Sequence, residues 1–170
     1  MEWIGISGSW RHSTPRLEQD VIKQVTKIIA NGDGIVTGGA LGVDYLATET
    51  VLKLDKTLKR LKIIIPTDLN NYTQHFKMRA KEGVITNKQA SLLIDQLKSV
   101  YKIRPNAIIE VQNAVAVDQK AYYVRNTAVV RACKRLVAFQ VNNSQGTQNA
   151  IETARNMGKK VKIYCYETTK

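Results

Sequence analysis

The feature that most constrains this chain is a short apolar stretch that runs into glycines at residues 35–44, Ile-Val-Thr-Gly-Gly-Ala-Leu-Gly-Val-Asp. Ile35 and Val36 are β-branched, as in a buried strand, and the apolar stripe after Gly42 predicts a helix that begins there. A strand that ends in glycines at a helix start leaves free N–H groups beyond the sheet. Together with the helix dipole, these groups favour an anion such as a phosphate. The alternative is a tight strand-to-helix turn that binds no ligand.

Strand and helix patterns alternate along most of the chain. We expect strands at residues 3–7, 34–37, 61–66, 135–141 and 160–166, and helices at residues 15–30, 42–58 and 121–134, with a further helix that ends at Met157. The β-α-β-α-β order is typical of a parallel, doubly wound sheet. The predicted fold class is therefore α/β: a single Rossmann-like domain over residues 1–170, with a mainly parallel sheet and helices on both faces.

The middle of the chain is less regular, and residues 68–118 could form an insert or a lid. We expect helices at residues 74–82 and 87–102, followed by a short strand or an extended connector at residues 107–111. The helix over residues 87–103 has an apolar face. That face could form an interface or a lid, or it could simply pack on the domain, which is the interpretation we favour.

Composition narrows the function classes. The net charge is +12, from 26 basic and 14 acidic residues, which either attracts polyanions or only keeps the protein soluble. The longest apolar run is well short of the roughly 20 residues of a membrane span. A strand pattern begins at Trp3 without a signal peptide, so we expect a cytoplasmic protein. Cys133 and Cys165 have apolar neighbours and are expected to be reduced core thiols, and we expect no metal and no cofactor.

Several strand ends could deliver polar groups to the same edge of the sheet, where open α/β sheets bind ligands. Hydroxyls, backbone N–H groups and two guanidinium groups would meet there, and a guanidinium suits a phosphate because it can bond two oxygens. The candidate residues for binding a ligand or its phosphate are Gly8, Ser9, Arg11, Gly38, Gly39, Gly42, Asp44, Arg125, Asn126, Ser144, Gly146 and Thr147.

Two of the candidate regions leave alternatives open. Asp44 could satisfy the dipole of its own helix, or it could bond a ribose hydroxyl. Trp10 could stack on a base, because a loop tryptophan beside Arg11 has little local core to fill. Tyr123, at the start of a helix, is more often a core residue.

Four motifs occur in an order that resembles the SLOG superfamily, named for the Smf/DprA and LOG proteins, and most of all its DprA-type Rossmann-like domain. They are Gly8-Ser9-Trp10-Arg11, the turn at residues 37–44, Val124-Arg125-Asn126, and Ser144-Gln145-Gly146-Thr147 with Ala154 and Gly158-Lys159. The resemblance implies a protein that binds a nucleotide or single-stranded nucleic acid, and a homodimer. Thr127 stands where DprA-like sequences usually carry a second arginine. We expect a bare domain, without a winged-helix tail or an N-terminal helical domain.

The LOG phosphoribohydrolases, which cleave an N-glycosidic bond, are the alternative within the same superfamily. Their glycine loop is followed by a catalytic glutamate, and Ala150 occupies that position here. Glu152 lies two residues further along the helix, about 200° around it, and should face elsewhere. We therefore expect a binding protein more than a nucleotide N-glycosidic-bond hydrolase or transferase.

Overall fold

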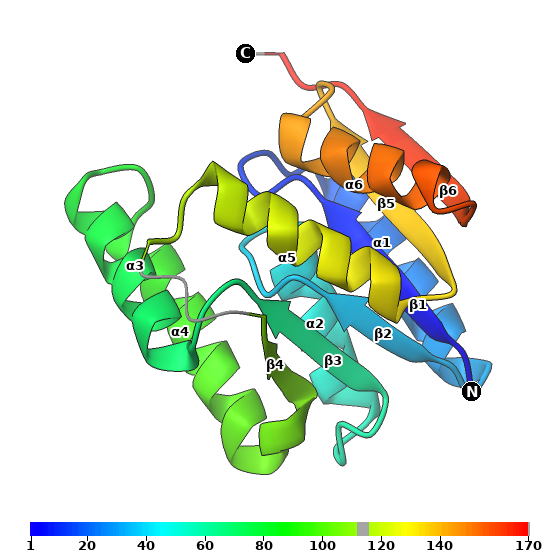
Figure 1. Ribbon diagram of the computed structural model, residues 1–170, viewed down its shortest axis with the longest axis horizontal. Helices are drawn as coiled ribbons and strands as arrows, with labels where there is room; N and C mark the ends of the chain where they lie inside the picture. Colours follow the sequence, from blue (N-terminus) through cyan, green and yellow to red (C-terminus); the bar gives the residue numbers. More distant parts are fainter. Residues whose placement is uncertain (112–115, 170) are drawn as a thin grey trace.

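The computed structural model describes residues 1–111 and 116–169, and a parallel sheet runs through its middle (Figure 1). The strands are β1 (Trp3–Gly8), β2 (Gly34–Thr37), β3 (Leu61–Ile65), β4 (Ile108–Glu110), β5 (Arg135–Val141) and β6 (Lys160–Tyr166). The α-helices are α1 (Pro15–Ala30), α2 (Val43–Leu54), α3 (Leu69–Lys81), α4 (Asn87–Ile103), α5 (Gln119–Ala132) and α6 (Gln145–Asn156). The α/β Rossmann-like fold predicted from the sequence is confirmed.

The strand order is β4-β3-β2-β1-β5-β6, and each neighbouring pair is parallel. The chain adds β2, β3 and β4 on one side of β1 and then returns to add β5 and β6 on the other. The pairing of Gly8 with Phe139 marks the carboxyl end of the β1–β5 pair. In a sheet of this kind, the ligand crevice lies outside the strand ends where the order reverses. The topology therefore puts the ends of β1, β2 and β5 at one site.

Helices cover both faces of the sheet. Figure 1 shows α5 and α6 on the near face and α1 and α2 on the far face. Apolar residues of α6, such as Ile151 and Ala154, pack on Leu136 and Ala138 of β5. The larger core lies on the other face, where α1, α2 and α4 contribute buried side chains. None of the helices in the described residues is long and apolar enough to cross a membrane.

The segment between β3 and β4 folds into two helices that join the main core. Leu93, Leu97 and Val100 of α4 are fully buried in it, so the apolar face of α4 packs on the domain, as favoured above. α3 begins at Leu69, five residues before the predicted start, because Asp68 caps it by accepting a hydrogen bond from the N–H of Asn71 at 2.9 Å.

Two further expectations were wrong. The helix expected to run to residue 58 ends at Leu54, because the carboxylate of Asp55 accepts hydrogen bonds from the N–H groups of Thr57 and Arg60 and fixes a turn. Cys133 is buried, but Cys165 is exposed. Cys165 belongs to β6, which lies at the edge of the sheet and is only partly covered.

Candidate functional site

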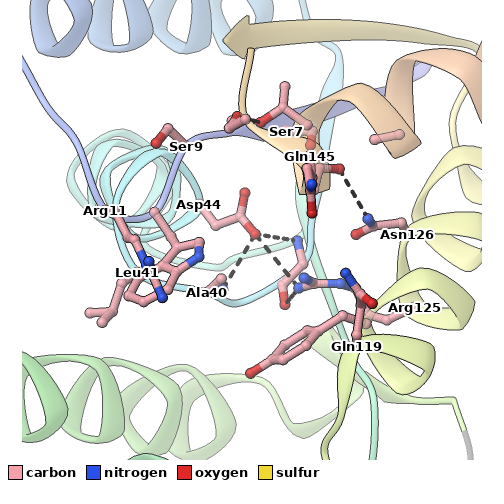
Figure 2. A pocket seen from close by; sticks show the side chains of 18 of the residues that line it. Ser7, Ser9, Arg11, Ala40, Leu41, Asp44, Gln119, Arg125, Asn126 and Gln145 are labelled. Atoms are coloured by element: carbon pink, nitrogen blue, oxygen red, sulfur yellow. Dashed lines mark hydrogen bonds and ion pairs between the residues drawn. The ribbon is translucent and has the colours of Figure 1, made fainter. Parts of the chain in front are cut away.

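A cavity of about 810 Å³ opens at the carboxyl edge of the sheet. Its walls come from the loop after β1, the turn after β2, α3, α5 and the start of α6 (Figure 2). The predicted site residues that line it are Gly8, Ser9, Trp10, Arg11, Gly38, Asp44, Arg125, Asn126, Ser144, Gly146 and Thr147. Gly39 and Gly42 belong to the turn after β2 but are not among the lining residues. The topology thus brings together most of the residues that the sequence analysis selected.

The turn between β2 and α2 is occupied by a side chain of its own helix. Asp44 Oδ2 accepts hydrogen bonds from the N–H of Gly38 at 3.1 Å and of Ala40 at 3.3 Å (Figure 2). Arg125 approaches from α5, donates to the carbonyl of Gly38, and places Nη1 3.7 Å from the same carboxylate oxygen. The carboxylate of Asp44 therefore already accepts hydrogen bonds from two of the N–H groups that could have bound an anion.

The glycines of this turn make room for the protein itself. A Cβ on Gly38 would collide with the guanidinium of Arg125, and one on Gly42 would collide with the carbonyl oxygen of Ser9. Gly42 also has a φ of +71°, which a residue with a side chain rarely adopts. Tyr72 of α3 also stabilises this turn, because its buried hydroxyl donates a hydrogen bond to the carbonyl of Gly39 at 3.1 Å.

The Asp44–Arg125 pair is buried, with 7 % of each residue exposed. Burial raises the pKa of Asp44, while the Arg125 charge and the two backbone donors act against that rise. Arg125 Nε is buried and has no hydrogen-bond partner among the described residues. Buried polar groups are nearly always paired, so this guanidinium retains an unused donor beside the cavity.

The turn between β5 and α6 is open. Apart from its chain neighbours and the backbone of α6 itself, no atom lies within 4 Å of where a Cβ on Gly146 would lie. The N–H groups of Gln145, Gly146 and Thr147 belong to the first turn of α6, where a helix has no internal acceptor. Within the described part of the chain none of them makes a hydrogen bond elsewhere.

Side chains around the start of α6 organise this open turn. Ser144 Oγ donates to Thr147 Oγ1 at 2.8 Å, and Thr147 is 2 % exposed. The amide of Asn126 donates to the carbonyl of Gly146 and to the side chain of Asn149, at 3.3 and 3.1 Å. Asn126 therefore links α5 to α6, and its amide N–H groups are already hydrogen-bonded within the protein.

The far wall of the cavity comes from α3 and was missed in the sequence. His75 Nε2 lies 3.0 Å from the hydroxyl of Tyr122, and Arg79 lines the same wall. Tyr122 also lies beneath Arg125, with the guanidinium carbon 5.3 Å from the ring centre. The only sequence signal was the residue content of the 68–118 segment, which gives no indication that α3 would face the other loops.

Trp10 lies on the loop after β1 and is 38 % exposed. The guanidinium of Arg11 is 4.5 Å from the centre of its ring, so the two side chains form one cationic and aromatic surface at the cavity wall. Tyr123 also lines the cavity, and its hydroxyl accepts a hydrogen bond from Gln119 at 3.1 Å.

The position that holds a catalytic glutamate in the LOG enzymes also lies at the cavity. Ala150 lies in its wall, 2 % exposed, whereas Glu152 is exposed and accepts a hydrogen bond from Gln148, as expected. The carboxylates that line the cavity are Asp44 and Asp118, and Asp118 caps α5 by accepting from the N–H of Ala121 at 2.8 Å. Residues 1–111 and 116–169 contain no cluster of three histidine, cysteine or acidic side chains that could hold a metal.

Several solved structures have a fold similar to that of this chain. DNA processing protein A (DprA) of Helicobacter pylori superposes with a TM-score of 0.68 at 21 % identity, over 95 % of this chain and 64 % of that one. The DprA of Streptococcus pneumoniae superposes with a TM-score of 0.50 at 15 % identity, over 94 % of this chain and 58 % of that one. The structural-genomics target TM1055 superposes with a TM-score of 0.56 at 14 % identity, over 95 % of this chain and 72 % of that one.

This chain has the fold of DprA. That likeness agrees with the SLOG resemblance seen in the sequence motifs. The chain spans less than two thirds of the length of either DprA. No protein-family model matches the sequence, and no curated protein matches it.

Proposed function

We propose that the cavity binds the phosphate of a nucleotide, either free or within a single nucleic-acid strand, at the start of α6. The observation that carries this proposal is the open turn: three unbonded N–H groups, two hydroxyls and a glycine with free space around it. A helix N-terminus with unbonded donors is a ready site for an anion. The turn after β2 acts as a support, because Asp44 and Arg125 already fill it.

The rest of the cavity suits the other parts of a nucleotide. Its volume of about 810 Å³ falls in the range of about 300–1,000 Å³ that is usual for small-ligand sites. Trp10 and Tyr122 offer aromatic surfaces for a base, and Arg11 adds a positive charge to the cavity wall. Stacking of a base on such a ring contributes about 1–3 kcal/mol.

The fold comparison bears on which of the two ligand forms is bound. The H. pylori DprA is described as a single-stranded DNA-binding protein with a unique binding mode. Single-strand binding by this chain is part of the same proposal. A small nucleotide alone would saturate one site per chain and respond little to moderate salt. The affinity for a single nucleic-acid strand would fall steeply as salt is added, with a log–log slope of about −0.7 for each neutralised phosphate.

The test is fluorescence anisotropy of a labelled oligothymidylate, titrated at several salt concentrations, together with thermal shift using a panel of nucleoside phosphates. Arg11→Ala and the pair Ser144→Ala/Thr147→Val should each weaken binding about tenfold, the scale of one lost charged contact. Arg16→Ala is the matched control, since it removes an exposed arginine that does not line the cavity. Equal losses in Arg11→Ala and Arg16→Ala would contradict the cavity as the binding site.

Pairing of two copies, which the SLOG resemblance implies, is a further part of the proposal. Light scattering of the purified protein at several concentrations measures it directly. A mass that stays at one chain of 19.1 kDa throughout would exclude it.

A further inference from the structure

The cavity accounts for little of the positive charge of this protein. Arg11, Arg79 and Arg125 are the basic residues that line it, apart from two histidines, and Asp44 and Asp118 oppose them. The remaining basic residues lie elsewhere, and residues 119–166 alone contain eight of them against a single acid, Glu152. The question is what this second concentration of charge does.

The charge gathers where β5 and β6 begin, at the sheet edge opposite the cavity and at the right of Figure 1. Arg135 pairs directly with Lys160 on the neighbouring strand, and Lys162 follows two residues later on the same face. Lys134 lies at the start of β5, where its N–H donates to the carbonyl of Trp3 at 2.7 Å. Arg131 and Arg155 lie in the last turns of α5 and α6, which end at this edge. These six residues are called the β5–β6 basic cluster.

Internal structure does not explain this cluster. Other cations at the same edge have a clear internal role: Arg60 donates to the last turn of α1, and Lys159 donates to carbonyls at the end of α5. None of the six cluster residues forms an ion pair within the described ranges 1–111 and 116–169. Like charges placed opposite each other on paired strands repel and destabilise the sheet. A polyanion would neutralise exactly that repulsion.

We propose that the β5–β6 basic cluster is a second nucleic-acid surface, which holds the phosphate backbone of a strand on the side of the domain away from the cavity. Lys134, Lys160 and Lys162 are exposed, and they lie in or directly before the first residues of the paired strands β5 and β6. Lys162 also lies over the ring of Tyr164, 4.8 Å from its centre. Ammonium groups that form no ion pair release counterions when phosphates bind them, so this surface contributes to the affinity for long strands and to its salt dependence. This surface should not distinguish between base sequences, because contacts with the phosphate backbone do not depend on the bases.

The test compares two triple variants of equal charge. Lys134→Gln/Lys160→Gln/Lys162→Gln removes three charges from the cluster. Lys77→Gln/Lys88→Gln/Lys98→Gln removes three exposed charges from α3 and α4, on the other side of the molecule. Each is titrated against a labelled 30-nucleotide oligothymidylate from low to moderate salt. The cluster variant should bind at least about tenfold more weakly and lose about two units of log–log salt slope, at about 0.7 for each phosphate. The α3–α4 variant should lose less than half as much.

Three results would overturn the proposal: equal losses in the two triple variants, no loss in either, or no oligonucleotide binding by the unmodified protein at low salt. Selective loss of binding to vesicles of anionic lipid, with oligonucleotide binding kept, would also overturn it and assign the surface to a membrane. Lys134→Arg/Lys160→Arg/Lys162→Arg should restore the oligonucleotide affinity. Thermal shift with small nucleoside phosphates should be the same in both triple variants, so a failure of the cavity proposal would be seen separately.

Discussion

The two glycine-containing turns of this protein have the same position relative to the sheet and opposite contents. The turn at residues 38–42 is filled by Asp44, Arg125 and the carbonyl of Ser9, whereas the turn at residues 142–147 leaves its N–H groups and the space at Gly146 open. In both turns, the glycines in the sequence predict that another group approaches the backbone closely. The comparison teaches that a glycine marks a close approach but does not say whether the protein or a ligand makes it.

The largest expected effect is that of Gly42→Ala. The new Cβ would meet the Ser9 carbonyl, and the φ of +71° would be strained. Strain and overpacking together predict a loss of about 4 kcal/mol in the free energy of unfolding. Urea denaturation followed by circular dichroism measures it. A loss below about 1 kcal/mol would show that the filled turn can open.

Arg125→Met comes next, because it leaves the buried carboxylate of Asp44 without its partner charge. We expect a loss of about 3 kcal/mol. The double variant Asp44→Asn/Arg125→Met should be more stable than Arg125→Met, since neither charge then remains buried. Urea denaturation of the two single variants and the double one forms a double-mutant cycle. Additive losses in the cycle would mean that the two side chains act independently.

The pH dependence of stability separates the α3 wall of the cavity from the open turn after β5. Burial, together with the charge of Arg79, lowers the pKa of His75 from its ordinary value of 6.5. The unfolded chain therefore takes up this proton at a higher pH than the folded one, and the free energy of unfolding falls as the pH drops from 6.5 through the lower folded pKa.

His75→Gln should remove that part of the pH dependence. Thr147→Val should leave it intact, because residues 142–147 contain no titratable side chain. Urea denaturation at several pH values between 5 and 7 gives the profile. The same profile in all three proteins would contradict the assignment to His75.

The smallest effect on stability is expected for Gly146→Ala, although its effect on binding should be large. Nothing lies near the new methyl group, and alanine favours the helix, so the free energy of unfolding should change by less than about 1 kcal/mol, towards greater stability. Oligonucleotide and nucleotide affinity should fall, because the methyl group covers the donors of the first turn of α6. Unchanged affinity in the anisotropy assay would move the phosphate site away from this turn.

The sequence predicted the fold well where local signals were strong. α1 and β5 have the predicted bounds, because Thr14 and Pro15 define a helix start and the run from Leu136 to Val141 is almost wholly apolar. α3 was predicted to start too late because the capping role of Asp68 was not recognised. The predicted site residues were brought together because parallel strand ends share an edge, which is a property of the topology.

Contacts between distant residues could not be predicted in this way. Arg125 reaches Gly38 across 87 positions of the chain, and no local pattern shows which side chain will fill a glycine's space. The wall formed by His75 and Tyr122 depends on how α3 packs in the crossover between β3 and β4. Both features follow from tertiary packing, so they became visible only in three dimensions.

The place of β1 in the sheet has a consequence for synthesis of the chain. β1 is made first, yet its pairing with β5 joins Gly8 to Phe139, and the open turn that follows β5 is made later still. While the first strands emerge and pair, one side of β1 has no partner and the cavity has neither its α5 wall nor its α6 wall. The cavity is therefore incomplete until nearly all of the domain has left the ribosome, so the binding proposed for it would depend on completed folding.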